Sequence, residues 1–136
     1  MNRRDFLSTG AGAAATILSG CAPGIPLIYG LETESSIRVR KPVAELDAVG
    51  GAIRVDVEET GKIILVRRTS VDSYSAISLE CAHLGCTVRV EGPQFRCPCH
   101  GSAYDADGSV LRGPADRPLR TFPVRATESE FIIDLR

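Results

Sequence analysis

The sequence predicts an all-β domain made of short antiparallel strands. Apolar and polar residues alternate with a period of two in most of the chain after residue 35, as in strands with one buried face. Stretches rich in Gly, Pro and Asp separate these segments and predict turns. The stretch AELDAVGG, residues 44–51, predicts a single helical turn at most.

Six segments carry the strand pattern, and the most continuously apolar of them, KIILVRR, predicts a strand that is more buried than the others. In chain order they are SIRVRK (36–41), AIRVDV (52–57), KIILVRR (62–68), YSAISL (74–79), TVRV (87–90) and FIIDL (131–135). The predicted turns after residue 90 are EGPQ (91–94), DADG (105–108) and RGPADRP (112–118).

The N-terminus has the features of an export signal. Paired Arg3 and Arg4, followed by Phe6 and Leu7, resemble the twin-arginine signal, whose core is Arg-Arg-x-Phe-Leu. A mildly apolar run, STGAGAAATILSG (8–20), follows the pair. The alternative is an ordinary signal peptide that happens to hold two arginines. Either signal places the folded part outside the cytoplasm, and the twin-arginine route favours a domain that acquires a cofactor before export.

The stretch LSGC (18–21) resembles the lipobox of bacterial lipoproteins, in which the cysteine is lipidated and becomes the first residue. The resemblance implies a lipid anchor at Cys21 on the periplasmic side of the membrane. Two alternatives remain: a chance thiol, or an uncleaved transmembrane anchor, which Pro23 and Pro26 disfavour. The predicted organisation is a signal at 1–20, a Pro- and Gly-rich tether at 21–35 and a folded domain at 36–136.

Charge argues against a nucleic-acid partner. The whole chain has a formal net charge of −1. No run of Lys or Arg follows residue 68, so the domain lacks the basic stripe that binds phosphates.

Two short stretches, CAHLGC (81–86) and CPCHGSAY (97–104), hold both histidines and all but one of the five cysteines. They lie between predicted strands, and loops on a rigid scaffold commonly carry function. Structural zinc is one interpretation, because Cys and His pairs are its usual ligands. Zinc would use four of the six side chains, and a disulfide could join the other two thiols.

A different site fits better, because each loop offers one Cys and one His at short spacing. A Rieske-type 2Fe–2S cluster has two cysteines on one iron and two histidines on the other. The stretches resemble the Rieske motifs Cys-x-His-x-Gly-Cys and Cys-Pro-Cys-His-Gly-Ser-x-Tyr. The resemblance implies four ligands, namely Cys81, His83, Cys97 and His100.

The same resemblance implies a disulfide between Cys86 and Cys99, which an exported protein can keep. It also implies a Rieske-type antiparallel β sandwich with a small cluster-binding subdomain at about 80–117. Within that subdomain RGPA (112–115) is similar to the family's proline loop.

Ser102 and Tyr104 match positions that donate hydrogen bonds to sulfur in relatives from cytochrome bc and bf complexes. Such donors stabilise the extra electron and raise the reduction potential. The alternative is that both are ordinary strand residues. Together with the disulfide cysteines they favour the high-potential class over oxygenase-type ferredoxins.

The predicted function is one-electron transfer, as the quinol-oxidising subunit of a quinol–cytochrome c reductase. Its redox partners would then be a quinol with cytochrome b, and a c-type cytochrome. Two alternatives stay open. One is the small subunit of a periplasmic molybdenum oxidase similar to arsenite oxidase. The other is a free-standing lipid-anchored carrier.

Overall fold

The computed structural model describes residues 24–136, and within them the predicted all-β fold is confirmed. The predicted helical turn is a single 3₁₀ turn, Ala44–Leu46. Arg3, Arg4 and Cys21 lie outside the described residues, so the export signal and the lipid anchor stay predictions. No helix in residues 24–136 is long and apolar enough to cross a membrane.

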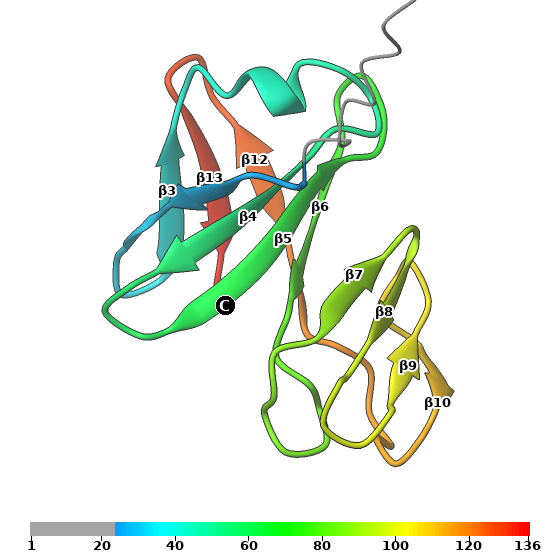
Figure 1. The fold of residues 1–136 in the computed structure, drawn as a ribbon. Helices are drawn as coiled ribbons and strands as arrows, with labels where there is room; N and C mark the ends of the chain where they lie inside the picture. The colour runs from blue at the N-terminus through cyan, green and yellow to red at the C-terminus, as the bar shows by residue number, and fades with distance from the viewer. Residues whose placement is uncertain (1–23) are drawn as a thin grey trace, which may run out of the picture.

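The described strands form three sheets (Figure 1). The largest has the order β1 (Leu27–Tyr29), β4 (Ala52–Val57), β5 (Lys62–Arg68), β6 (Tyr74–Ser78) and β11 (Thr121–Phe122). The second has the order β12 (Val124–Ala126), β13 (Glu130–Asp134), β3 (Ser36–Arg40) and β2 (Leu31–Glu32). The third has the order β10 (Val110–Arg112), β9 (Ala103–Tyr104), β8 (Gln94–Arg96) and β7 (Arg89–Glu91).

The first two sheets pack face to face as a sandwich, and alternation along the strands determines which residues form its core. Ile64 and Val66 of β5 point into the sandwich and join Ile37 and Ile133 from the opposing sheet. Leu65, between them in sequence, points the other way into a second core. Strand β5 is therefore covered on both faces, which explains its continuous apolar sequence.

The second core joins the third sheet to the sandwich. Leu65 and Ile77 from the large sheet pack in it with Phe95 and Tyr104 from the small sheet. Cys81 and Cys97 belong to the same core, with exposed fractions of 3% and 1%. The small sheet therefore cannot move without disturbing the environment of these two thiols, because their surroundings are close-packed.

The structure differs from the sequence-based prediction at the proposed tether. Residues 27–32 form β1 and β2, so the folded part begins before residue 36. Gly30 lies where the chain passes from one sheet to the other, and a Cβ there would come within 2.6 Å of Ile37 and Val55 side chains. Glycine is the residue that fits this crossing without displacing these side chains. The same glycine, read as part of a Pro- and Gly-rich stretch, is what predicts a flexible tether from the sequence. A tether from Cys21 extends no further than residue 26.

One pairing at this point departs from the antiparallel pattern, because β1, which the sequence did not predict, pairs with β4 in parallel. Every other strand pairing in the described part of the chain is antiparallel. A parallel neighbour needs a long connection, and residues 30–51 supply it by way of the second sheet.

Candidate metal centre

The two Cys/His stretches fold into loops of the same design at the end of the small sheet. In the first loop Cys81 N–H donates to Cys86 O at 2.7 Å, and Gly85 N–H donates to Cys81 O at 2.9 Å. In the second, Cys97 N–H donates to Ser102 O at 2.7 Å and Gly101 N–H to Cys97 O at 3.1 Å. Gly85 and Gly101 have φ values of +81° and +83°, a conformation that other residues rarely adopt. Each loop therefore holds its first cysteine at the base and its histidine in the turn.

This design brings all four predicted ligand side chains to one place. Cys81 and Cys97 are free thiols and are buried. His83 and His100 lie next to each other in the turns, with ring centroids 4.9 Å apart at an interplanar angle of 89°. Sulfur thus lies on the inner side of the site and imidazole on the outer side.

One unsatisfied polar atom of the site fits a bound metal. His83 Nδ1 is buried and makes no hydrogen bond, although a buried polar atom without a partner is costly. A metal ion bonded to this nitrogen would remove that cost. The donor set of two thiols and two imidazoles, with sulfur inside and nitrogen outside, suits a 2Fe–2S cluster with two irons of different ligation.

A disulfide between Cys86 and Cys99 joins the two loops, with a Cα–Cα distance of 6.5 Å. The pairing that the motif resemblance implied is therefore present. Both disulfide sulfurs lie within 4.8 Å of the Cys97 sulfur. Because they are bonded to each other they are not thiolate ligands, and of these three sulfurs only that of Cys97 remains free for a metal.

Tyr104 contacts the base of the first loop through its hydroxyl. The ring is fully buried, and Oη lies 3.2 Å from Cys81 Sγ. The same oxygen accepts a hydrogen bond from Ala82 N–H at 3.2 Å, so its own proton is available to the sulfur. Burial, with the neighbouring Cys81 thiol, raises the pKa of Tyr104 to about 12. Tyr104 is therefore a donor at any physiological pH.

The electrostatics of Cys81 favour a thiolate. Burial raises the pKa of its thiol, but hydrogen bonds from Tyr104 and from the His83 backbone outweigh burial and bring the pKa below its usual value. A site that stabilises negative charge on sulfur suits a metal ligand, since the thiolate is the form that binds metal.

Ser102 is fully buried, and its hydroxyl oxygen accepts a hydrogen bond from Ala115 N–H at 3.0 Å. This bond joins the second loop to the segment that resembles a proline loop. It also uses the oxygen as an acceptor, which leaves the hydroxyl proton free to donate elsewhere. The sequence did not suggest this role for Ala115, because a backbone donor has no sequence signature.

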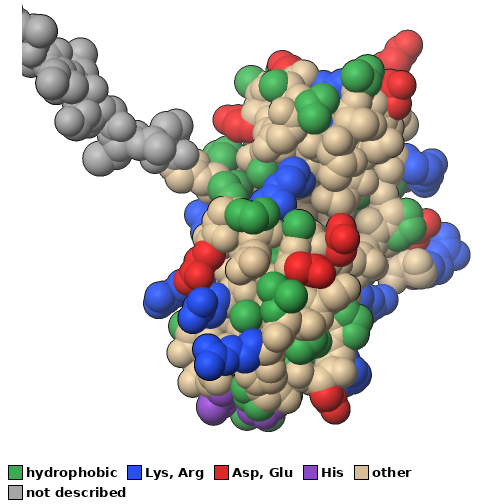
Figure 2. Space-filling model, turned by 90° about the vertical axis from the view of Figure 1, so that its right-hand side faces the viewer, with side chains coloured by type: hydrophobic (Ala, Val, Ile, Leu, Met, Phe, Trp, Pro, Cys, Tyr) green, Lys and Arg blue, Asp and Glu red, His purple; other side chains and the backbone are tan. Residues whose placement is uncertain are grey.

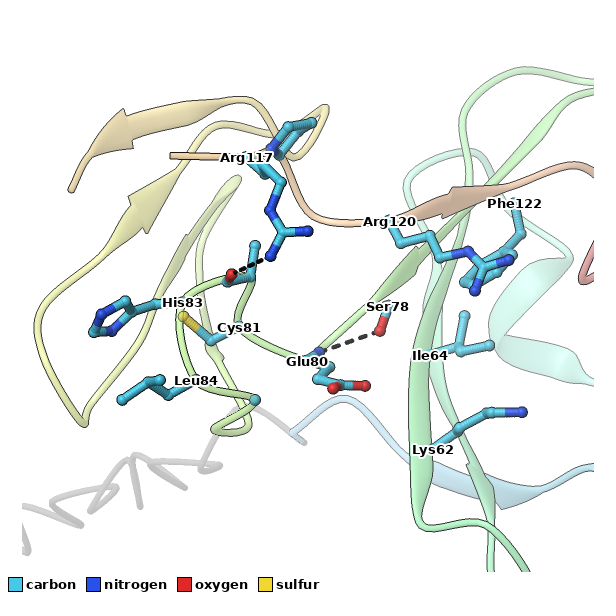
Figure 3. A pocket seen from close by; sticks show the side chains of 13 residues that line it. Lys62, Ile64, Ser78, Glu80, Cys81, His83, Leu84, Arg117, Arg120 and Phe122 are labelled. Carbon is cyan, nitrogen blue, oxygen red and sulfur yellow. Dashed lines mark hydrogen bonds between the residues drawn. The ribbon is translucent and has the colours of Figure 1, made fainter. Parts of the chain in front are cut away.

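Arg117 is a further residue that sequence reasoning missed. Its guanidinium donates to Ala82 O at 3.3 Å, between the first cysteine and histidine of the loop (Figure 3). A groove of about 500 Å³ opens beside this contact, lined by His83, Leu84, Glu80 and Arg120 among others. The distribution of charged residues along the sequence gives no reason to select this arginine from the others.

A family profile decides what this site is: the Rieske [2Fe-2S] domain matches residues 39–123. The chain belongs to the Rieske family. It carries one electron at a time through a 2Fe–2S cluster. The predicted fold class and cofactor are thereby confirmed.

Individual relatives of this Rieske chain are iron-sulfur subunits of cytochrome b6-f complexes. The cytochrome b6-f complex iron-sulfur subunit of Gloeobacter violaceus is 52% identical over 153 aligned residues, covering 96% of this chain and 80% of the relative. The cytochrome b6-f complex iron-sulfur subunit 2 of Trichormus variabilis is 33% identical, covering 94% and 82%.

A solved structure is also similar, that of the plasma membrane Rieske protein PetC3 from the cyanobacterium Synechocystis PCC 6803. It superposes with a TM-score of 0.55 at 29% identity. The match covers 70% of this chain and 97% of that structure.

Proposed function

We propose that this Rieske protein is the high-potential electron-transfer subunit of a membrane-bound, quinol-oxidising cytochrome complex. The observation that carries the proposal is the buried Tyr104 hydroxyl, 3.2 Å from the sulfur of Cys81. A donor to a ligand sulfur stabilises the reduced state, and quinol oxidation needs a positive potential. The cytochrome b6-f subunits among its relatives support the same assignment.

In this proposal Cys81 and Cys97 hold one iron, and His83 and His100 hold the other. The cluster, when bound, supplies a site that accepts one electron. The chain's own part is to exclude water from the sulfur side, because Cys81 and Cys97 are buried. The histidine side is more open, since His100 is exposed and Leu84 is 69% exposed. Quinol and the electron acceptor would therefore approach from the histidine side.

The proposal includes a location. The signal at 1–20 would send the folded protein across the membrane by the twin-arginine route, and Cys21 would carry a lipid on the periplasmic side. The disulfide of Cys86 with Cys99 supports a location outside the cytoplasm, where such bonds persist. Electron partners would be cytochrome b with its quinol, and a c-type cytochrome.

A free-standing carrier at the plasma membrane is the second candidate. The resemblance to the Synechocystis plasma membrane Rieske protein favours it. Such a protein would hold the same ligands and pass electrons without a stable complex.

Purification of the full chain from its own membranes in mild detergent tests the proposal. We expect a cytochrome b to co-purify, and quinol–cytochrome c reductase activity to be lost when the chain is deleted and restored by the wild type. Co-purification with a molybdenum subunit would assign the chain to the other class of oxidoreductase. A protein that purifies alone, with reductase activity unchanged by its deletion, would favour the free carrier.

A further inference from the structure

The segment Leu27–Glu32 closes one edge of the sandwich, and its residues alternate between inside and outside. Ile28 packs against the sandwich core, and Gly30 lies over Ile37 and Val55 from opposite sheets. Glu32 is bound by Lys62. The even-numbered residues therefore face the protein.

The odd-numbered residues of this segment are all large and apolar, and all point outward. Leu27 is 44% exposed, and Tyr29 and Leu31 are each 63% exposed. An edge strand usually carries charges on its outer side, because exposed apolar edges promote association. Leu27 and Tyr29 lie on β1 of the large sheet and Leu31 on β2 of the second sheet, so three large apolar side chains are exposed at alternate positions along the segment that crosses this edge, and we call them the stripe.

The position of this stripe in the chain points to its partner. Leu27 follows Cys21 by six residues, so it lies within about 22 Å of the proposed lipid attachment even when the chain is fully extended. Figure 2 shows hydrophobic side chains beside the point where the described chain begins, and the histidines at the far end of the molecule. A stripe so close to the anchor cannot leave the neighbourhood of the bilayer.

The charges around the stripe also suit a lipid surface. Strand register places Arg54 beside Leu27 and Arg38 beside Leu31, and Arg38 also forms an ion pair with Glu130 at 3.0 Å. Arginine can reach lipid phosphates while its stem lies along apolar surface. Tyrosine is enriched at membrane–water interfaces, where its ring is apolar and its hydroxyl stays wet. Asp56 beside Tyr29 is the one acid among these cross-strand neighbours.

We propose that Leu27, Tyr29 and Leu31 form a membrane-docking stripe that lays this edge of the sandwich on the lipid surface. The proposal rests on the anchor at Cys21 from the proposed function. Docking would fix the height and orientation of the head while the histidine loops remain clear of the bilayer, and undocking would release the head to meet a partner.

The absence of tryptophan from the chain allows a direct test. Tyr29→Trp places a single indole in the stripe, and Leu111→Trp places one at an exposed site on β10, in the small sheet at the opposite end of the fold (Figure 1). Each full-length, lipidated variant is reconstituted into vesicles of phosphatidylcholine and phosphatidylglycerol, with and without brominated acyl chains. Retained cluster absorption shows that each variant is folded.

We expect the indole at position 29 to shift its emission to the blue and to lose intensity with brominated lipid, while the indole at 111 does neither. Adding Leu27→Ser and Leu31→Ser should reduce quenching at position 29 to the level of position 111. Adding Leu27→Ile and Leu31→Ile should preserve the quenching.

Equal emission from both positions on vesicles that retain the protein would overturn the docking stripe and leave the anchor intact. Protein that fails to sediment with vesicles would overturn both the stripe and the anchor. An indole at 29 that is shielded only in a purified complex, and not quenched by lipid, would assign the stripe to a protein partner and overturn lipid docking. The vesicles contain no cytochrome, so the vesicle results do not depend on the quinol-oxidising role.

Discussion

At the scale of single residues, the hydroxyl of Tyr104 has two contacts that act together. It accepts from Ala82 N–H and donates to Cys81 Sγ, each at 3.2 Å. The ring is fully buried, so water cannot replace the donor when it is removed. Hydrogen bonds to charged groups are stronger than neutral ones, and the sulfur gains negative charge on reduction. Tyr104 therefore stabilises the reduced state more than the oxidised state.

Replacing Tyr104 by Phe should lower the reduction potential. If the lost bond differs between redox states by about 1.4 kcal/mol, the potential falls by roughly 60 mV for a one-electron couple. Protein-film voltammetry measures this shift. Tyr74→Phe is the matched control, because Tyr74 packs against Phe131 in the sandwich core, away from the loops. A Tyr104→Phe potential equal to that of the wild type would contradict the tuning role.

Ser102 has a different balance of effects, because its oxygen accepts from Ala115 N–H. Ser102→Ala would leave that buried donor unpaired, which costs about 1–3 kcal/mol of stability. The reduction potential of this variant would therefore change for two reasons, the lost hydrogen bond to the cluster and the loosened segment around Ala115. The Tyr104→Phe variant gives the cleaner measurement of a hydrogen bond to sulfur.

At the scale of elements, the two loops share one backbone design and depend on each other. Each loop is closed by its own hydrogen bonds, but each supplies only one free cysteine and one histidine to the metal centre. The disulfide of Cys86 with Cys99 spans 13 positions in sequence and holds the loops face to face. A bond that closes a loop of about 15 residues stabilises the fold by about 3 kcal/mol in the chain-entropy account.

Cys86→Ser should keep all four ligands yet release iron faster, because the loops can then separate. Loss of visible absorption on warming measures the rate. In Cys86→Ser the freed Cys99 thiol would lie beside Cys97, because the sulfurs of Cys97 and Cys99 lie within 4.8 Å of each other. The double variant Cys86→Ser with Cys99→Ser removes this extra thiol and is the control. If the double variant keeps its cluster as long as the wild type does, the disulfide has no role in holding the loops together.

An ion pair between β2 and β5 joins the two sheets of the sandwich. Glu32 of β2 accepts hydrogen bonds from Lys62 of β5 and from Thr60. The bond from Lys62, then that from Thr60, holds the pKa of Glu32 below its usual value of 4.5. A depressed folded pKa means that the contribution to stability is present above about pH 4.5 and is lost as pH falls through the lower folded pKa.

Glu32→Gln should therefore lower the free energy of unfolding by up to about 1 kcal/mol at pH 7, with the difference from the wild type shrinking below pH 4.5. Urea unfolding at several pH values measures this. Glu34→Gln is the control, since Glu34 forms no ion pair within residues 24–136. A difference between Glu32→Gln and wild type that stays constant from pH 7 to acid would contradict the assignment.

Element length explains which parts of the fold the sequence could predict. Six segments of four to seven residues carry an alternating or continuously apolar strand pattern, and each coincides with a strand, although TVRV overlaps β7 only in part. Strands β8 to β12 have two or three residues, too few to show a period. The loop ligands could be proposed because the two stretches resemble the Rieske motifs, which are defined by side-chain identity and spacing. The backbone donors Ala82 and Ala115 could not, since only the folded chain brings them to Tyr104 and Ser102.

At the scale of the whole molecule, the N-terminal edge belongs to the sandwich and the metal centre to the small sheet, while Ile25 near the start of the described chain packs against the second core. The chain enters at β1, beside β4, whereas the Cys/His loops lie at the end of the small sheet (Figure 1). The two parts communicate through β5, whose side chains belong to both cores. Because the cores on both faces of β5 are close-packed, motion of the metal centre relative to a membrane requires motion of the whole head. The proposed attachment at Cys21 would therefore determine how far the centre can travel.

Replacing Cys21 by Ala tests that attachment. If LSGC is a lipobox, the variant should stay unprocessed or leave the membrane fraction, because no other cysteine follows the signal closely. Fractionation of cells and mass spectrometry of the intact chain distinguish these outcomes. Ser19→Ala keeps the pattern Leu-Ala-Gly-Cys and should be processed as the wild type is. A Cys21→Ala protein that remains in the membrane with the same intact N-terminus as the wild type would show instead that residues 6–22 act as an uncleaved anchor.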